Sequence, residues 1–160
     1  MRLLSILCLA LALAHPAFAQ TKTALTGGEL EAILRQAGFE PEMGTMENSG
    51  EPYANLKDKG FDFIARLREC EVASCSLLMF YANFTLDRDV VDRDYRAVNA
   101  YNDQELYGRA YVYAKENKVG IDLVIDLRGG VSTDYVRISA ERFPGMIKAF
   151  VDHYQEEMGR

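Results

Sequence analysis

The sequence predicts an α+β fold in which a single antiparallel sheet packs against three helices. Two features of the 160 residues predict this fold. Segments whose apolar residues recur every three or four positions, as on a helix face, alternate with segments in which they recur every second position, as on a strand face. No repeat, low-complexity stretch or linker divides the chain, so one domain is expected. The expected order is helix, three or four strands, helix, two strands, helix, and one sheet covered by helices buries these elements economically.

The first helix is expected over about residues 27–37. Thr26 and Glu29 have the spacing of a capping box, in which each side chain hydrogen-bonds the backbone N–H of the other residue. Leu25 and Leu30 flank that box as a hydrophobic staple. These signals predict a helix start despite the two glycines that follow Thr26.

Strands are expected from Phe39 to Phe84, where apolar and polar residues alternate. Two weak strands, over 39–46 and 53–57, precede a stronger pair of long strands. Such alternation is typical of half-buried antiparallel strands. The side chains of the long strands that are expected to face the core are Phe61, Phe63, Ala65, Leu67, Leu78, Phe80, Ala82 and Phe84.

Cys70 and Cys75 fall where the two long strands would be joined. Four residues separate them, which is too many for a redox C-x-x-C motif, and too few further ligands accompany them for a zinc site. We expect a structural disulfide that closes the hairpin, with about 2 kcal/mol of stabilisation from the constrained unfolded chain. Two free thiols in a solvated turn are the alternative.

A second helix is expected to begin within residues 87–94, with Asp87 or Asp89 as its N-cap. Helix capping explains the four aspartates of this segment better than a calcium loop does, because the glycine and the bidentate glutamate of an EF-hand are missing. The residues expected on the inward face of this helix are Val91, Tyr95, Val98 and Asn102.

Two further strands, over 107–115 and 119–127, are expected to form a hairpin around residues 116–118. A last helix follows Ser132, its expected N-cap. Pro144 should kink or break this helix, because proline lacks a backbone donor and crowds the preceding turn. The inward residues expected in the last strand are Ile121, Leu123, Ile125 and Leu127, and those of the last helix are Val136, Ala140, Phe143, Ile147, Phe150 and Tyr154.

The first nineteen residues have the pattern of a secretory signal peptide. Arg2 gives a positive start, residues 3–14 are an uncharged apolar run, and residues 17–19 read Ala-Phe-Ala, a small-residue cleavage site before Gln20. A membrane anchor is the alternative, but the run is interrupted before it reaches the length of about 20 residues that crosses a bilayer. We therefore expect cleavage between Ala19 and Gln20 and export to the bacterial periplasm.

Composition and motifs argue against several classes of function. A formal net charge of −6 disfavours nucleic-acid binding. With one histidine after the export segment, no nucleophile elbow and no glycine-rich phosphate loop, we expect no catalytic residue, no cofactor and no metal site. The enzymatic alternative is a hydrolase whose carboxylates, among them Asp62, Asp122 and Asp126, are brought together by the fold. Along one strand Asp122 and Asp126 would lie about 13 Å apart, beyond the spacing of a glycosidase pair.

A candidate surface for binding a partner remains. Alternating residues of one strand would place three phenols and a guanidinium on one face, which could clasp an extended peptide or another subunit. The alternative is ordinary packing of this strand face beneath a helix. The candidate partner-binding residues are Tyr107, Arg109, Tyr111 and Tyr113, with the amides Asn99 and Asn102 of the preceding helix.

Several short segments resemble, in their order and spacing, the YbjN-domain family. They are Phe61-Asp62-Phe63, the Cys70/Cys75 hairpin, Tyr81-Ala82-Asn83-Phe84, Asn99-Ala100-Tyr101-Asn102, Tyr107-Gly108-Arg109-Ala110-Tyr111 and Gly129-Gly130-Val131-Ser132. The resemblance runs from about Leu30 to Tyr154, with Tyr101 where the family commonly has tryptophan. It implies a fold similar to type III secretion chaperones, in the order α-β-β-β-α-β-β-α, and the label of a sensory-transduction regulator. It implies no activity.

The sequence therefore predicts an exported, non-enzymatic protein-binding or chaperone-like module that acts as a regulator. Its organisation is a signal peptide over residues 1–19, a polar tail and helix cap over 20–28, and a YbjN-like α+β domain over 29–157. Its partner would be another protein or a second copy of the chain in a homodimer, reached by β-strand addition and aromatic anchoring. Neither nucleic-acid binding nor stable membrane insertion is expected.

Overall fold

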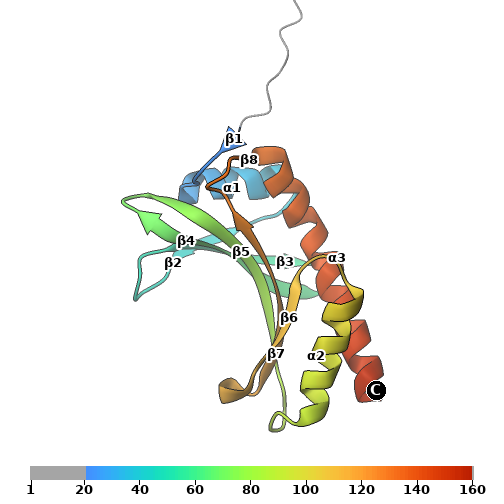
Figure 1. Cartoon of the computed structure of the whole chain (residues 1–160). Helices are drawn as coiled ribbons and strands as arrows, with labels where there is room; N and C mark the ends of the chain where they lie inside the picture. The colour runs from blue at the N-terminus through green and yellow to red at the C-terminus, as the bar shows by residue number, and fades with distance from the viewer. Residues whose placement is uncertain (1–20, 160) are drawn as a thin grey trace, which may run out of the picture.

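The computed structural model describes residues 21–159, in which three helices pack against an antiparallel sheet (Figure 1). The sheet has the strand order β2-β3-β4-β5-β7-β6. Its strands are β2 (Glu42–Thr45), β3 (Pro52–Asp58), β4 (Phe61–Glu71), β5 (Ser74–Thr85), β6 (Arg109–Tyr113) and β7 (Lys118–Asp126). The helices are α1 (Gly27–Gln36), α2 (Asp92–Gln104) and α3 (Thr133–Met158). The predicted α+β class is confirmed; the predicted cleavage site at Ala19 and Gln20 lies outside the described residues.

The predicted start of α1 is confirmed. The Thr26 hydroxyl accepts from the Glu29 N–H at 3.2 Å, and the Glu29 carboxylate accepts from the Thr26 N–H at 2.9 Å. Leu25 and Leu30, the two residues of the expected staple, are fully buried. The first four N–H groups of a helix have no intrahelical acceptor. Reciprocal capping therefore fixes where the chain turns into the helix.

The residues just before α1 join the sheet system. Thr21–Lys22 forms β1, which pairs with β8 (Val131–Ser132) in a separate two-stranded ladder. Leu25 exchanges two backbone hydrogen bonds with Cys75, at 2.9 and 2.8 Å. The segment that follows the expected cleavage site is thus tied to the rest of the fold.

The long hairpin of β4 and β5 is closed by a disulfide. Cys70 and Cys75 lie directly opposite each other, and their sulfur atoms are joined at 2.07 Å. Cys75 is also the residue that bonds Leu25, so the bridge links the hairpin tip to the start of α1.

The core lies between the sheet and the helices. The alternation expected for β4, β5 and β7 is confirmed, because the residues predicted to point inward are buried or pack against the buried cluster. At its centre the Phe143 ring of α3 lies 5.5 Å from the Phe63 ring and 5.7 Å from the Phe80 ring, measured between centroids. These contacts fix α3 across the middle of the sheet.

The expected start of α2 within residues 87–94 and the burial of Val98 are confirmed, but the predicted N-cap and the rest of the predicted inward face are wrong. The helix begins at Asp92, its N-cap is Val91, and neither Asp87 nor Asp89 caps it. Val91 and Tyr95 are 48% and 45% exposed. The residues that α2 buries are Asp94, Ala97, Val98 and Tyr101. The physical reason is Asp94: its carboxylate accepts the Val91 N–H at 2.8 Å and is paired with Arg88, so a charged residue occupies an inward position.

Of the two outcomes expected at Pro144, a kink or a break, the break does not occur, because α3 continues through it to Met158. Pro144 lies on the buried face, between the core residues Phe143 and Ile147. Burial of these large side chains outweighs the cost of about 3 kcal/mol that an interior proline imposes on a helix.

Four strands lie between α1 and α2, which agrees with the three or four expected from the alternation pattern, whereas the order implied by the family resemblance has three. The first of them is only Glu42–Thr45 rather than 39–46. The β6–β7 connection includes a 3₁₀ turn, η1 (Ala114–Glu116), followed by Asn117 at φ 50°. Among residues 21–159, no helix is both long and apolar enough to span a membrane.

Candidate partner-binding face

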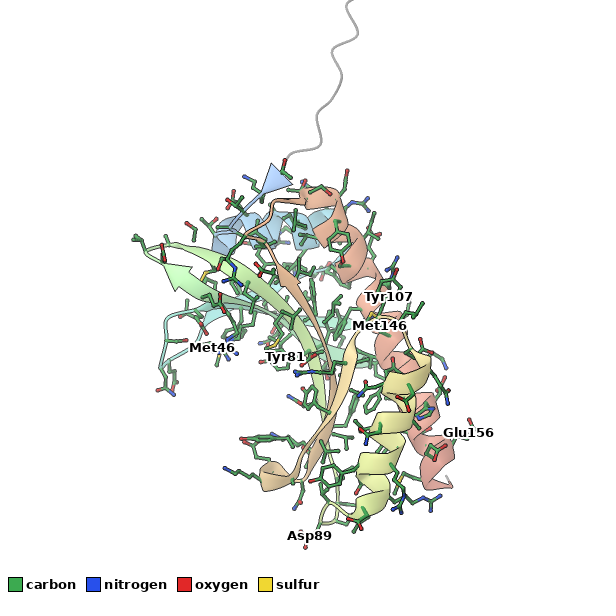
Figure 2. The ribbon with its side chains drawn as sticks, in the orientation of Figure 1. Met46, Tyr81, Asp89, Tyr107, Met146 and Glu156 are labelled. Carbon is green, nitrogen blue, oxygen red and sulfur yellow. A yellow bond between two sulfur atoms is a disulfide. The ribbon has the colours of Figure 1, made fainter. Side chains whose placement is uncertain are left out.

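The two faces of the sheet have different surroundings. One face packs on the helices, and the other, which we call the open face, is turned away from them (Figure 1). Figure 2 shows Tyr81 on this side, whereas Tyr107 lies beside α3, near Met146 of that helix. Because strand side chains alternate, the open face is formed by the neighbours of the core residues in each strand. These are Tyr53, Asn55, Ile64, Arg66, Leu77, Met79, Tyr81, Asn83, Arg109, Tyr111, Tyr113, Asp122 and Val124.

The strand register places these side chains in rows that cross the sheet. One row runs from edge to edge through Glu42, Asn55, Ile64, Tyr81, Asp122 and Arg109. An adjacent row runs through Gly44, Tyr53, Arg66, Met79 and Val124. Each row contains both apolar or aromatic side chains and charged ones, which is the mixed chemistry of an interface core and its rim.

Two tyrosines lie flat over glycines of the neighbouring strands. A Cβ atom on Gly120 would be 2.7 Å from Cζ of Tyr111, and one on Gly44 would be 2.6 Å from Cζ of Tyr53. Any larger residue at these glycines would displace the ring. Tyr111 is consequently half-buried, and burial raises its pKa to about 12. Its hydroxyl donates to Oδ1 of Asn83 at 2.6 Å.

Arg109 is held by Asp122 at the β6 edge of the open face. The guanidinium donates from Nε and Nη2 to the two carboxylate oxygens, at 3.2 and 2.5 Å. Asp122 is only 5% exposed, whereas the Arg109 side chain is 70% exposed. The hydrogen bond and charge of Asp122 raise the pKa of Arg109. Arg109 therefore neutralises a buried acid and still presents a face to solvent.

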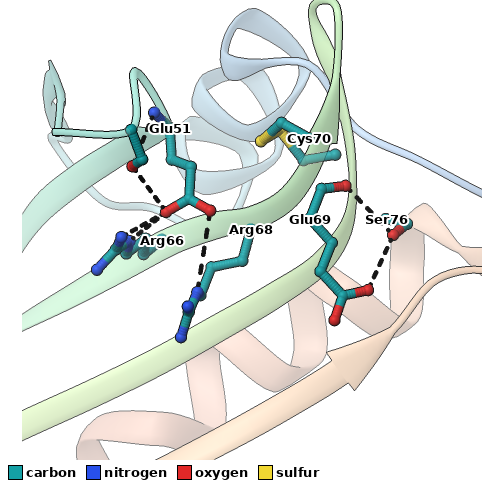
Figure 3. Close-up of polar contacts among 8 residues, drawn as sticks. Glu51, Arg66, Arg68, Glu69, Cys70 and Ser76 are labelled. Carbon is teal, nitrogen blue, oxygen red and sulfur yellow. Dashed lines mark hydrogen bonds and ion pairs between the residues drawn. A yellow bond between two sulfur atoms is a disulfide. The ribbon is translucent and has the colours of Figure 1, made fainter.

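A second ion cluster joins β4 to the turn that precedes β3 (Figure 3). Nε of Arg66 donates to Oε2 of Glu51 at 3.0 Å, and Arg68 lies 4.0 Å from the other oxygen. Burial alone would raise the pKa of Glu51, but the hydrogen bonds from Arg66 and Ser49 and the nearby guanidinium charges lower it. The Arg66 and Glu51 side chains are 19% and 14% exposed, so this pair is fixed rather than freely solvated.

A cavity of about 470 Å³ opens beside β2. Ile64 and Tyr81 of the open face line it, with the amides of Asn55 and Asn83. Its size is within the range of ordinary ligand pockets.

The structure separates the six predicted site residues. Arg109, Tyr111 and Tyr113 lie together on the open face, and no helix of the described chain covers them. Tyr107 precedes β6 and instead lies under the guanidinium of Arg142 on α3, with 4.6 Å between guanidinium carbon and ring centroid.

The two predicted amides lie on α2. Asn102 uses its amide on the backbone of Ala110, accepting from its N–H at 2.8 Å and donating to its C=O at 3.0 Å. Asn99 is exposed on the outside of the helix. Neither side chain belongs to the open face.

Sequence reasoning missed the central part of the open face, which includes Ile64, Leu77, Met79 and Tyr81. A signal was present: these apolar residues occupy the outward positions of two long strands, where a solvated face would carry polar residues throughout. The signal was obscured because Asp62, Arg66 and Arg68 alternate with them on the same face.

The carboxylates of the hydrolase alternative do not converge. Asp62 pairs with Lys57 at 3.1 Å, and Asp126 pairs with Arg128 at 2.6 Å. Asp122 pairs with Arg109, in a different row of the sheet. Arg128 lowers the pKa of Asp126 to about 2 by hydrogen bonding from its side chain and its backbone. Across residues 21–159, no group of three or more His, Cys, Asp or Glu side chains could hold a metal ion.

Comparison with known proteins identifies one family. The sequence model of the YbjN family, described as "Putative bacterial sensory transduction regulator", matches residues 26–156. This range runs from the cap of α1 almost to the end of α3, so it includes every strand of the open face. No curated protein matches the chain.

Proposed function

The chain belongs to the YbjN family, and from this premise we propose that it is a non-enzymatic regulatory module that binds a protein partner on the open face. The observation that carries the proposal is the composition of that face. Apolar and aromatic side chains occupy it although no helix of the described residues packs there, and Val124 and Tyr113 are each 46% exposed. Exposed apolar patches rimmed by charge are typical of interaction sites, and tyrosine and arginine are enriched among the residues that dominate binding energy.

The sheet edges favour one direction of approach. At the β6 edge, Asn102 already satisfies both backbone groups of Ala110, so an added strand would have to displace it. At the β2 edge, the Met46 N–H donates to the Glu51 C=O, and hydrogen-bonded pairs alternate along an antiparallel ladder. The backbone groups of Thr45 therefore point away from β3. We propose that an extended partner segment pairs with β2 at Thr45 and then crosses the open face.

Site-specific photo-crosslinking in cells tests this function. A photoreactive residue at Val124, on the open face, is expected to give a discrete adduct with a partner protein or with a second copy of the chain. The matched control is Ile138, which is 42% exposed on α3. Adducts of equal yield and identity from both positions, or none from Val124, would refute the open face as the binding surface.

We also propose that the protein works after export to the periplasm. The Cys70–Cys75 disulfide supports this location, because such bridges persist in oxidising compartments. Fractionation of the same crosslinked cells tests this location. The protein should be found in the periplasmic fraction, with an intact mass that corresponds to a chain beginning at Gln20.

A further inference from the structure

The cavity beside β2 has the chemistry of a cation site. Its carboxylates are those of Glu40, Glu42 and Asp62, and its one cation is Lys57. Lys57 is already paired with Asp62 at 3.1 Å. Within residues 21–159, neither Glu40 nor Glu42 forms an ion pair or a side-chain hydrogen bond, so two negative charges at this cavity are uncompensated.

The other residues that line the cavity form a surface on which the aliphatic part of a long side chain can pack. Ile64 and Tyr81 are neighbours on adjacent strands, and both are partly buried. Together they offer an apolar surface and an aromatic face, which attracts a cation placed over it. Asn55 lies between Glu42 and Ile64 in the same row, so a side chain crossing this row would pass from apolar to amide to carboxylate.

The acidic character continues outside the cavity. An adjoining hollow shares Glu40, Glu42 and Lys57 with it, and adds Asp58 and Glu141 to its lining. The cations of the open face that lie outside the cavity each lie within 4.0 Å of a carboxylate oxygen; they are Arg66, Arg68, Arg109 and Lys118. The negative field at the β2 end is therefore not cancelled from the neighbouring strands.

We propose that this cavity receives an arginine or lysine side chain from the part of the partner segment that crosses the open face. The inference rests on the proposed function and deepens it, because it states the chemistry of the partner: an extended segment with a basic residue whose stem lies over Ile64, beside Tyr81, and whose head reaches Glu42. A long basic side chain buries its aliphatic stem on apolar surface while its charged head reaches the acids.

Peptide titration of the full mature protein tests the assignment. The probe is a capped heptapeptide of alternating threonine and valine with a central arginine, and the matched probe has glutamine at the centre. Side-chain amide signals of Asn55 and Asn83 report binding at the cavity by NMR. The arginine peptide is expected to bind about tenfold more tightly, because its guanidinium can pair with Glu40 and Glu42, whereas glutamine carries no charge.

Two variants locate the effect. Glu42→Gln is expected to weaken binding of the arginine peptide about fivefold, whereas Glu47→Gln, an exposed acid outside the cavity, should change it by less than about twofold. Agmatine, which carries a guanidinium without a peptide, should bind at least about tenfold more weakly than the arginine peptide.

Three results would overturn the cavity assignment: equal binding of the two peptides, an unchanged affinity in Glu42→Gln, or the absence of arginine-dependent shifts at Asn55 and Asn83. If agmatine bound as tightly as the arginine peptide, the cavity would recognise a free guanidinium, and the proposal that a protein segment occupies it would be wrong. Any of these results combined with a specific Val124 adduct would leave the proposed function standing. An arginine-selective cavity without a Val124 adduct would instead refute the proposed function alone.

Discussion

Asp94 shows how a single charged residue can join three parts of the chain. Its carboxylate is fully buried at the third position of α2 and accepts two hydrogen bonds from Arg88, at 2.8 and 2.7 Å. It also accepts from the hydroxyl of Tyr154 in α3. The hydrogen bonds from Arg88 outweigh burial and hold the pKa of Asp94 well below its usual range. Burial and the neighbouring carboxylate raise the pKa of Tyr154 to about 12.

Replacing Asp94 with asparagine should lower the free energy of unfolding by about 2–3 kcal/mol at neutral pH. Breaking a buried pair costs more than this, but Arg88 is 30% exposed and water solvates its freed charge. Chemical denaturation measures the effect. The control is Asp92→Asn, which removes an exposed acid from the same helical turn and should cost well under about 1 kcal/mol.

Comparison of the wild type with Asp94→Asn also gives a prediction for the pH dependence of stability. The folded-state pKa of Asp94 lies below its unfolded value of about 3.9, so its stabilising contribution is fully present above that pH and is lost as the pH falls towards the folded-state pKa. The stability gap between wild type and Asp94→Asn should therefore be constant above about pH 5 and narrow below about pH 4. A gap that stays constant down to pH 2 would contradict the assigned pairing.

At the scale of elements, α2 both covers the core and closes the β6 edge of the sheet. Asn102 of α2 supplies to Ala110 the hydrogen bonds that a further strand would otherwise supply. Natural sheets protect their edges against unwanted pairing, and this amide is such a protection.

Asn102→Ala should destabilise the fold by about 1–2 kcal/mol, because two neutral hydrogen bonds are lost and a strand edge is left open. Hydrogen exchange should be faster at the Ala110 amide than in the wild type. Asn99→Ala, on the same helix but exposed, should leave both quantities unchanged. Unaltered exchange at Ala110 in Asn102→Ala would show that the amide does not guard this edge.

Element types were more predictable than helix registers. The capping box at Thr26 and the alternation of β4 and β5 are local patterns, and both were predicted correctly. The register of α2 was not, because hydropathy assigns Asp94 to the surface, and its burial becomes favourable only through Arg88, six residues earlier, and the distant Tyr154. Pro144 was misjudged for a similar reason: the packing that keeps α3 continuous comes from strands far away in the sequence.

At the scale of the whole molecule, the function proposed here depends on which sheet face the helices leave open. Alternation distinguishes the two faces of each strand, but the sequence does not say which edge strands extend the open face. Arg109, Tyr111 and Tyr113 could be grouped from one strand alone. Only the strand order shows that they share one face with Tyr53 and Tyr81. The rings of Tyr53 and Tyr111 also need the space that glycines in other strands leave free.

The affinity of the crosslinked partner for two lysine variants tests the central claim most directly. Val124→Lys puts a charge on the open face, and Ile138→Lys puts the same charge on the outside of α3, at nearly equal starting exposure. We predict that the first raises the Kd at least about tenfold and the second changes it by less than about twofold, with circular dichroism showing both folded. Equal Kd values for the two folded variants would contradict binding on the open face.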